Sequence, residues 1–181
     1  MATTIIPQGY LLPGEPNWLT NFAKALPQGA VMVELGTYKG KSAHHLALGL
    51  KGVGGTLITV DTHLDYMDCD KFIGDQYIKA LYDNRLLGTI IPIIGDFYKV
   101  RTFFKSKVDA IFFDGLHEYD NISKDFANWS PLIKDGGFAI FHDYHKGFPG
   151  VKRFVDSISE QKDQWENCGG GTSIRCFKKL R

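Results

Sequence analysis

Short apolar runs rich in β-branched and aromatic residues alternate along the chain with longer amphipathic stretches. Apolar runs of this length are typical of strands buried in a sheet, whereas apolar residues three or four positions apart indicate a helix. The predicted strands are 30–35, 56–60, 89–94, 109–113 and 137–141. The predicted helices are 17–26, 41–50, one within 71–87, 97–104, 119–129 and 151–162. Strands and helices that alternate in this way predict βαβ units and a mainly parallel sheet.

The C-terminal end of the chain has a different pattern. Two strand-like runs, 164–167 and 172–178, flank three consecutive glycines, which predicts a β-hairpin. We therefore predict an α/β fold with a doubly wound, mainly parallel, seven-stranded sheet that ends in this antiparallel hairpin. Residues 17–181 are expected to form a single domain, and residues 1–16, which contain three prolines, an irregular N-terminal arm.

The chain has 181 residues, of which 44% are hydrophobic and 23% charged, and its formal net charge is +1. This is the composition of one globular domain, and the near-neutral charge predicts neither nucleic acid nor an anionic membrane as a partner. No run of about 18 apolar residues and no signal-peptide pattern is present, so we expect a cytoplasmic protein. Three cysteines without a C-x-x-C pair favour simple burial over a disulfide framework or a zinc site.

The most specific motif lies between the first predicted strand and its helix, in the sequence VELGTYKGKS at 33–42. A dinucleotide fingerprint, G-x-G-x-x-G, is interrupted there by Thr37 and Tyr38. A P-loop would need one more residue between its two glycines, although the strand and acid at 110–114 resemble those of a nucleotidase. The third interpretation is the pattern E-x-G-x-x-x-G-x-S. A ligand is expected at this turn because doubly wound sheets bind ligands at the carboxyl ends of their strands.

The third pattern resembles motif I of S-adenosylmethionine-dependent methyltransferases. The resemblance implies that Glu34 faces the cationic end of the methionine portion of the cofactor. Gly36 allows a sharp turn and close approach of a ligand, and Gly40 allows the following helix to pack closely. The residues implied to bind the cofactor in this segment are Glu34, Gly36, Thr37, Tyr38, Gly40 and Ser42.

An acid directly follows the second predicted strand. This residue, Asp61, lies 25 positions beyond Gly36. A carboxylate at the end of this strand can accept hydrogen bonds from both hydroxyls of a ribose, and a P-loop protein has no use for it. Asp61 therefore favours an adenosine ligand over a phosphate, and Thr62 and His63 are placed to border that adenosine.

Gly95, Asp96 and Phe97 follow the third predicted strand. In the methyltransferases that motif I resembles, this position lines the adenine, with the acid near the exocyclic amine and an apolar residue against the ring. Asp96 is also suited to be the N-cap of the next helix. Both roles can hold together, because a cap uses only one carboxylate oxygen.

The stretch from the fourth to the fifth predicted strand carries three more elements, which are D-G-x-H-x-Y from Asp114, W-x-P-L-x-K-x-G-G from Trp129 and H-D-Y at 142–144. Together with motif I and Asp61 they resemble the methyltransferase-24 group of class I methyltransferases. This group is near the macrolide-sugar O-methyltransferases and, more distantly, catechol O-methyltransferase. The resemblance covers roughly 31–156. It implies methylation of a hydroxyl on a small molecule or sugar, with S-adenosylmethionine as cofactor.

Asp114, His142 and Asp143 follow neighbouring predicted strands, so we expect them to face the same crevice. Two carboxylates and an imidazole could bind one Mg²⁺ or another divalent cation. Metal-dependent members of the resemblance place acid–amide or acid–acid pairs where this chain has His142 and Asp143. The alternative is that Asp114 holds the methionine portion of the cofactor while Asp143 caps a loop.

His117, three residues after Asp114, is the candidate general base, and Asp114 is the second predicted catalytic residue. An unperturbed imidazole has a pKa of about 6.5, which suits removal of a proton from a hydroxyl at neutral pH. The sugar methyltransferases of the resemblance carry a base at the matching position. The alternative is a histidine that only marks the surface or the start of the next helix.

The chain has no insertion for recognising an acceptor. We therefore expect the small-molecule or saccharide acceptor to contact the arm, the acidic loop 65–70, the loop 144–150 or a second subunit of a homo-oligomer. Three other functions stay open at this point. They are a P-loop-like nucleotide phosphotransferase or hydrolase, a non-catalytic S-adenosylmethionine-binding module, and an iron-dependent hydroxylase of the cephalosporin-hydroxylase type.

Overall fold

The computed structural model describes residues 6–64 and 71–181, so the acidic loop predicted at 65–70 lies outside the described residues. The strands are β1 (Val31–Leu35), β2 (Thr56–Asp61), β3 (Ile90–Ile94), β4 (Val108–Phe113), β5 (Ile133–Phe141), β6 (Trp165–Asn167) and β7 (Arg175–Lys179). The helices are α1 (Glu15–Lys24), α2 (Lys41–Gly52), α3 (Gly74–Asp83), α4 (Phe97–Phe103), α5 (Tyr119–Trp129) and α6 (Pro149–Ser159).

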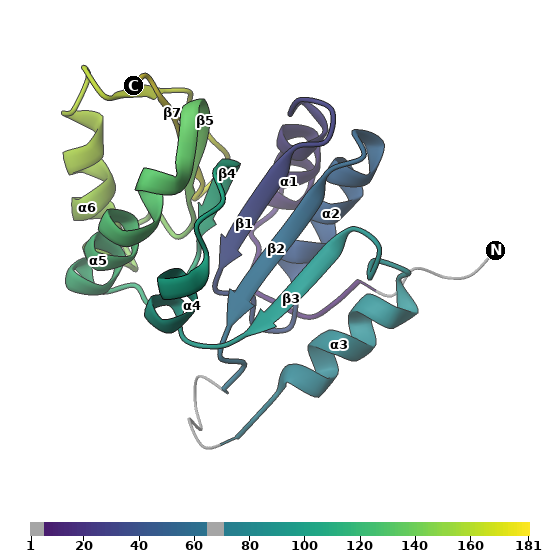
Figure 1. Ribbon diagram of the computed structural model, residues 1–181. Helices are drawn as coiled ribbons and strands as arrows, with labels where there is room; N and C mark the ends of the chain where they lie inside the picture. Colours follow the sequence, from purple (N-terminus) through teal and green to yellow (C-terminus); the bar gives the residue numbers. More distant parts are fainter. Residues whose placement is uncertain (1–5, 65–70) are drawn as a thin grey trace.

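The strands form one seven-stranded sheet with the order β3-β2-β1-β4-β5-β7-β6 (Figure 1). The first five strands of the chain run parallel, and β7 is antiparallel to both of its neighbours, β5 and β6. The doubly wound sheet and its C-terminal antiparallel pair are thus confirmed. From β1 the chain builds outward to β3 and then returns to β4 on the other side, so the switch point lies between β1 and β4.

Two layers of helices cover the two faces of the sheet. Helices α1, α2 and α3 pack on one face and α4, α5 and α6 on the other (Figure 1). Alternate residues of a strand pack against opposite helix layers. In β1, Met32 belongs to the core on the side of α1–α3 and Val33 to the core on the side of α4–α6. Tyr77 of α3 and Trp129 of α5 are among the largest side chains that are fully buried. These cores hold the strands rigidly beneath the loops that follow them.

The strand register brings three loops together at one edge of the sheet. Leu35, the last residue of β1, lies opposite Val60 of β2 and opposite Phe113 of β4. The loops that follow β1, β2 and β4 therefore begin side by side at the carboxyl edge, where the arrows of Figure 1 end. This edge carries most of the residues that the motifs single out.

Among the element boundaries that differ from the sequence prediction, the starts of α1 and β5 have a physical reason in the structure. Helix α1 begins at Glu15, two residues before the predicted start, because Gly14 adopts a left-handed conformation with φ of 92° and opens the helix earlier. Asn17 therefore lies within the helix. Strand β5 begins at Ile133, four residues early, because a register shift opposite β4 lets the strand continue through Gly136.

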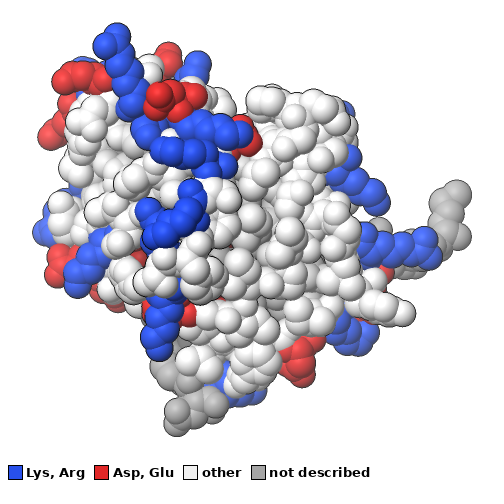
Figure 2. All heavy atoms as spheres, viewed as in Figure 1, with Lys and Arg blue, Asp and Glu red and all other residues white. Residues whose placement is uncertain are grey.

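Charged side chains of both signs are interspersed on the face shown in Figure 2. Basic side chains gather over the region of β5 and β7, and two lysines there are paired with acids. Lys134 lies 2.8 Å from Asp109, and Lys179 lies 3.9 Å from Asp135. Paired charges of this kind create little net field, which agrees with the near-neutral composition.

The C-terminal hairpin places two cysteines side by side. The backbone N–H of Cys168 donates to the carbonyl of Cys176 at 2.9 Å. Cys176 is buried as predicted, whereas Cys168 is exposed, so simple burial was wrong for that residue. Across the described parts of the chain, the helices are too short or too polar to traverse a bilayer.

Candidate active site

The turn after β1 requires its two glycines. Gly36 has φ of 89°, and a β-carbon there would overlap the backbone carbonyl of Asp114. Gly40 has φ of 88° and precedes α2, and a β-carbon there would lie 2.6 Å from the ring of Tyr77. The first glycine thus brings the loops after β1 and β4 into contact. The second lets the loop pack directly onto α3.

Asp61 organises this loop. Its Oδ2 accepts hydrogen bonds from the backbone N–H groups of Thr37 at 2.6 Å and Tyr38 at 2.8 Å. Its Oδ1 accepts from the N–H of His63 at 2.6 Å. The structure therefore brings the motif I loop and the acid after β2 together, as predicted. A ribose bound by Asp61 would have to share or replace these backbone donors.

Glu34 lies beneath the loop and is completely buried. Thr37 Oγ1 donates to Glu34 Oε2 at 2.9 Å, while Oε1 has no hydrogen-bond partner among the residues described. Burial raises the pKa of Glu34 to about 8, and the hydrogen bonds from Ser42 and Thr37 only partly oppose that rise. A buried carboxyl group with one oxygen lacking a hydrogen-bond partner is thus held under the turn.

His63 lies under the loop rather than beside a cavity. Its ring is buried, stacks on Tyr77 with centroids 4.8 Å apart, and has Nδ1 3.0 Å from the carbonyl of Tyr38. Both His63 and Tyr38 have positive φ, at 53° and 50°, which marks a constrained segment. Thr62 is exposed. Of the two residues expected to border the adenosine, only Thr62 is therefore accessible in this state.

The turn after β3 supports both roles considered for Asp96. Its Oδ1 accepts from the N–H groups of Tyr98 and Lys99, both at 3.0 Å, and so caps α4. Both of these hydrogen bonds use Oδ1, so the cap leaves Oδ2 for another donor. Phe97 packs against the loop after β4, since a β-carbon on Gly115 would lie 2.9 Å from its ring. The segment predicted to line the adenine is thus in contact with the loop after β4.

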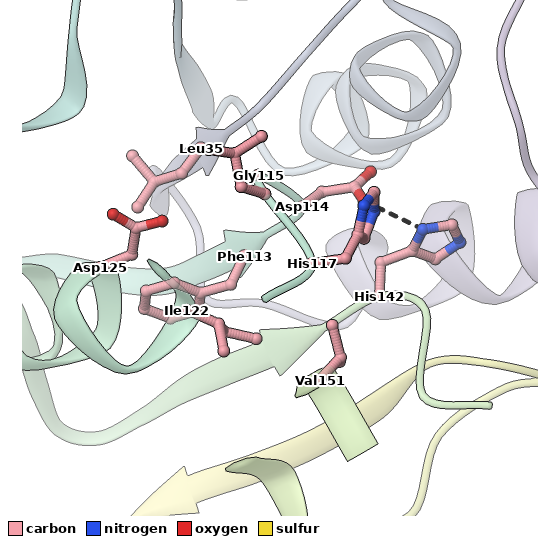
Figure 3. Close-up of a pocket in the computed structure, with 10 residues that line it drawn as sticks. Leu35, Phe113, Asp114, Gly115, His117, Ile122, Asp125, His142 and Val151 are labelled. Atoms are coloured by element: carbon pink, nitrogen blue, oxygen red, sulfur yellow. Dashed lines mark hydrogen bonds and ion pairs between the residues drawn. The ribbon is translucent and has the colours of Figure 1, made fainter. Parts of the chain in front are cut away.

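The loops after β4 and β5 bring two acids and two histidines together. His117 Nε2 lies 2.8 Å from Asp143 Oδ2. His142 Nδ1 lies 3.0 Å from Asp114 Oδ1 and 3.2 Å from Asp143 Oδ2. Figure 3 shows Asp114, His117 and His142 turned toward one another at one side of a pocket. All four residues predicted at this edge are therefore gathered into one cluster.

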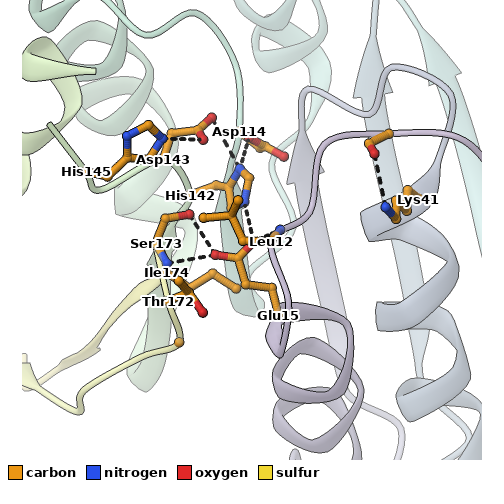
Figure 4. A network of polar contacts seen from close by, with 12 residues as sticks. Leu12, Glu15, Lys41, Asp114, His142, Asp143, His145, Thr172, Ser173 and Ile174 are labelled. Carbon is orange, nitrogen blue, oxygen red and sulfur yellow. Dashed lines mark hydrogen bonds and ion pairs between the residues drawn. The ribbon is translucent and has the colours of Figure 1, made fainter. Parts of the chain in front are cut away.

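A fifth member of the cluster comes from the other end of the chain. Glu15, at the start of α1, is fully buried, and its Oε2 lies 3.1 Å from His142 Nε2 (Figure 4). Its Oε1 accepts from the N–H and the hydroxyl of Ser173, both at 2.7 Å. Sequence reasoning missed Glu15, because an acid in the first turn of a helix has an ordinary explanation in the helix dipole. No local pattern distinguishes it.

The charges in this cluster support one another. Burial alone would lower the pKa of His142, but Asp114, Asp143 and Glu15 outweigh burial and raise it well above the ordinary value. Burial would raise the pKa of Glu15, but hydrogen bonds from His142 and Ser173 hold it well below the usual range. The pKa of Asp143 is likewise lowered, against burial, by its contacts with His117 and His142. His142 is thus the cation among these acids.

His117 has a different balance because it is more accessible. Burial would lower its pKa, yet the hydrogen bond and charge of Asp143 outweigh burial and raise the pKa. The ring also stacks on Phe148, with centroids 4.1 Å apart and 20° between the planes. Phe148 directly precedes α6 and was not predicted. The imidazole is thus held by a carboxylate at one nitrogen and by an aromatic face.

The three predicted metal ligands differ in their surroundings. Both ring nitrogens of His142 face carboxylates, and the residue is only 4% exposed. Ligand atoms that lie together within 4.8 Å belong to Asp114, His117 and Asp143. Two carboxylates and an imidazole are donors that suit a divalent ion. His117 thus joins Asp114 and Asp143 in a group that could hold such an ion.

The N-terminal arm runs over the motif I loop. The carbonyl of Gly9 accepts a hydrogen bond from Lys41 Nζ at 3.1 Å, and Tyr10 stacks on Tyr38 with centroids 5.9 Å apart. The arm thus connects the cofactor loop with Glu15 at the start of α1. A segment that was expected to be irregular takes part in both halves of the site.

The doubly wound sheet, the glycine turn after β1, the acid after β2 and the cluster after β4 and β5 together define a class I methyltransferase. The family model methyltransferase-24, described as a methyltransferase domain, matches residues 33–144. The match spans more than half of the chain. The chain belongs to this family.

Solved structures share the fold. One is the O-methyltransferase from Bacillus cereus in complex with S-adenosylhomocysteine (SAH), with 19% identity and a TM-score of 0.69 over 96% of this chain and 84% of that chain. Another is the O-methyltransferase TomG from Streptomyces achromogenes, in complex with S-adenosylmethionine, with 17% identity and a TM-score of 0.69 over 95% and 82%. A third is SAH-bound methyltransferase PaMTH1 from Podospora anserina, with 13% identity and a TM-score of 0.70 over 92% and 78%.

Proposed function

We propose that this protein transfers the methyl group of S-adenosylmethionine to a hydroxyl oxygen of a small-molecule or sugar acceptor. The observation that carries the proposal is the His117–Asp143 pair, 2.8 Å apart, beside the glycine turn and Asp61 at one edge of the sheet. Family membership supports methyl transfer. The cofactors in the complexes of similar fold support the choice of S-adenosylmethionine.

The cofactor would lie across the ends of β1 and β2. Asp61 would hold the ribose, exchanging its backbone donors for hydroxyls, and Glu34 would offer its unsatisfied oxygen to the cationic methionine end. The free oxygen of Asp96 would face the adenine amine, with Phe97 against the ring. The loop donates its N–H groups at Thr37 and Tyr38 to a carboxylate, which argues against a phosphate cradle.

His117 would act as the base through Nδ1. If Nε2–H donates to Asp143, Nδ1 keeps its lone pair, and no described residue is bonded to it. The acceptor hydroxyl would lose its proton to Nδ1 while its oxygen bonds to the methyl carbon and the carbon–sulfur bond breaks. The products are the methyl ether, SAH and an imidazolium that Asp143 stabilises. Most of the rate would come from positioning, because the cofactor supplies a reactive methyl group.

A divalent ion would be held by Asp114, His117 and Asp143, and its chemistry would be to lower the pKa of the acceptor hydroxyl. His117 cannot bind such an ion through Nε2 and keep the hydrogen bond that orients it as a base. The two roles are therefore alternatives. Activity that survives treatment with EDTA supports the role of His117 as general base. Activity that is lost with EDTA and restored by Mg²⁺ supports the role of the three residues as ligands of a divalent ion.

Calorimetry with SAH and, separately, with ATP tests the proposed cofactor. We expect SAH to bind and ATP not to bind, since the loop lacks free phosphate-binding donors. A screen of hydroxyl compounds with labelled S-adenosylmethionine then tests transfer. Tight ATP binding without SAH binding would overturn the proposal in favour of a nucleotide enzyme. SAH binding without transfer to any acceptor would favour a non-catalytic binding module.

A further inference from the structure

Glu15 is held in an unusually complete set of contacts for a residue at a helix start. Its carboxylate accepts from the backbone N–H of Leu12 at 2.7 Å, from both donors of Ser173, and faces His142 Nε2 at 3.1 Å. The side chain has no solvent exposure. Burying a carboxylate is costly unless its partners satisfy it, and a helix N-terminus needs only an exposed polar cap. The burial therefore points to a role beyond starting α1.

His142 transmits the position of Glu15 to the carboxylates of the site. Its Nε2 faces Glu15, and its Nδ1 faces both Asp114 and Asp143 (Figure 4). Both nitrogens of the ring are therefore within hydrogen-bonding distance of carboxylate oxygens on opposite sides. A ring that is bonded on both sides cannot flip or tilt without losing a contact. Glu15, at the start of α1, thus helps to fix the orientation of the His142 ring.

We propose that Glu15 is a positioning residue that, through His142, holds Asp114 and Asp143 and thereby orients His117. This inference rests on the function proposed above. The contacts run from Glu15 to His142 at 3.1 Å, from His142 to Asp143 at 3.2 Å and from Asp143 to His117 at 2.8 Å. The beginning of α1 therefore acts on the base through these contacts, from a side chain that is fully buried.

A matched pair of variants separates positioning from simple stability. Glu15→Gln keeps the size of the side chain, but its amide NH₂ cannot accept, so it cannot serve both His142 and Ser173. Ser173→Ala removes one hydroxyl donor from Glu15 and leaves the contact with His142 in place. If Glu15 had a purely structural role, Glu15→Gln and Ser173→Ala would differ only in melting temperature.

The first readout needs no acceptor. Long-range proton–nitrogen NMR spectra of the ¹⁵N-labelled full chain at a single neutral pH report which ring nitrogens of each histidine carry protons. We expect the ring signals of His142 and His117 in Ser173→Ala to match those of the wild type. In Glu15→Gln, we expect the ring signals of His142 to change and those of His117, two contacts further on, to shift. Unchanged His117 signals in Glu15→Gln would overturn the proposal, as would equal shifts in both variants.

The second readout is turnover with an acceptor found by the screen above. We expect Glu15→Gln to lower kcat by about 10-fold or more, as misplaced catalytic groups do, with the Kd for SAH unchanged within about 2-fold. Ser173→Ala should keep the wild-type kcat, and a kcat that falls equally in both variants would refute positioning. If Glu15→Gln does not fold, Glu15→Asp replaces it, because the shorter side chain loses the 3.1 Å contact with His142, and unchanged His117 signals in that variant would contradict the proposal. A wild type that transfers no methyl group would overturn the proposed function, while the NMR result would still decide the role of Glu15 within the cluster.

Discussion

The two halves of the site are built in different ways. The cofactor half, at the ends of β1 and β2, is held mainly by backbone N–H groups of two loops that donate to Asp61. The catalytic half, at the ends of β4 and β5, is held by contacts between side chains drawn from α1 and from the loops after β4 and β5. The first depends on the backbone conformation of its loops, and the second on how side chains pack, one of them from the opposite end of the chain.

This difference predicts which property a substitution in each half of the site should change. A change in the cofactor half should disturb the backbone, and with it folding or cofactor affinity. A change in the catalytic half should leave the backbone in place and act on turnover or its pH dependence. Four variants test this contrast, each with a control of the same type elsewhere in the chain.

The largest effect is expected from Gly36→Ala. The new β-carbon would overlap the carbonyl of Asp114 and would also strain a residue with positive φ. We expect the free energy of unfolding to fall by about 3 kcal/mol or more. Urea denaturation measures this loss. Gly88→Ala is the control, because nothing lies within 4 Å of a β-carbon there. Equal stability of the two variants would contradict the tight turn.

The next effect is expected from His117→Ala. Removal of a general base typically lowers kcat by about 10²- to 10⁴-fold, while the cofactor half should keep its affinity for SAH. Initial rates and calorimetry measure the two quantities. His45→Ala, on the outer part of α2, is the control and should be nearly fully active. Turnover that is unchanged in His117→Ala would remove His117 from the mechanism.

A smaller effect is expected from Asp61→Asn. The amide would lose charge-assisted hydrogen bonds both to the loop and to a ribose, so SAH should bind about 10- to 100-fold more weakly. Calorimetry measures the affinity, and kcat at saturating cofactor should change much less. The exposed Asp83, paired with Lys79 at 2.6 Å, supplies the control Asp83→Asn. Undiminished SAH affinity in Asp61→Asn would place the ribose elsewhere.

The smallest effect is a shift in pH dependence. The proposed base must be neutral, so kcat/KM should rise with pH through the pKa of His117, which Asp143 and Asp114 raise above 6.5 against the effect of burial. Asp143→Asn removes one of these charges, which lowers that pKa and moves the rise to lower pH. Asp156→Asn, which loses contacts to Tyr144 and Lys152 only, should keep the wild-type profile. A profile that shifts to higher pH in Asp143→Asn would contradict the assigned charges.

The order of strands and helices could be predicted because each element has its own apolar period, and the parallel sheet follows from their alternation. The start of α1 could not, because it depends on the left-handed Gly14 and on a buried acid that looks like any other residue of a first helical turn. The start of β5 was missed because a register shift opposite β4 extends the strand through Gly136. The starts of α1 and β5 both depend on contacts with other elements of the fold.

For the site, motifs predicted which residues would meet but not which atoms would bond. His142 and Asp143 were expected to act together on a metal ion, yet the two differ in what surrounds them. His142 contacts the buried Glu15, which in turn accepts a hydrogen bond from Ser173. Asp143, by contrast, contacts His117. Adjacent residues after a strand point in different directions, so identity alone could not assign their partners.

The sequence by itself determined the family, the doubly wound sheet and the gathering of Gly36, Asp61 and Asp114 at one edge. These follow from patterns read within short segments and from the rule that parallel strands end together. Only the tertiary structure decided that Glu15 reaches His142, that both nitrogens of this histidine face carboxylates, and that His117 lies beside Asp114 and Asp143. The physical reason is that the charge and hydrogen bonding of a buried group depend on neighbours far away in the chain.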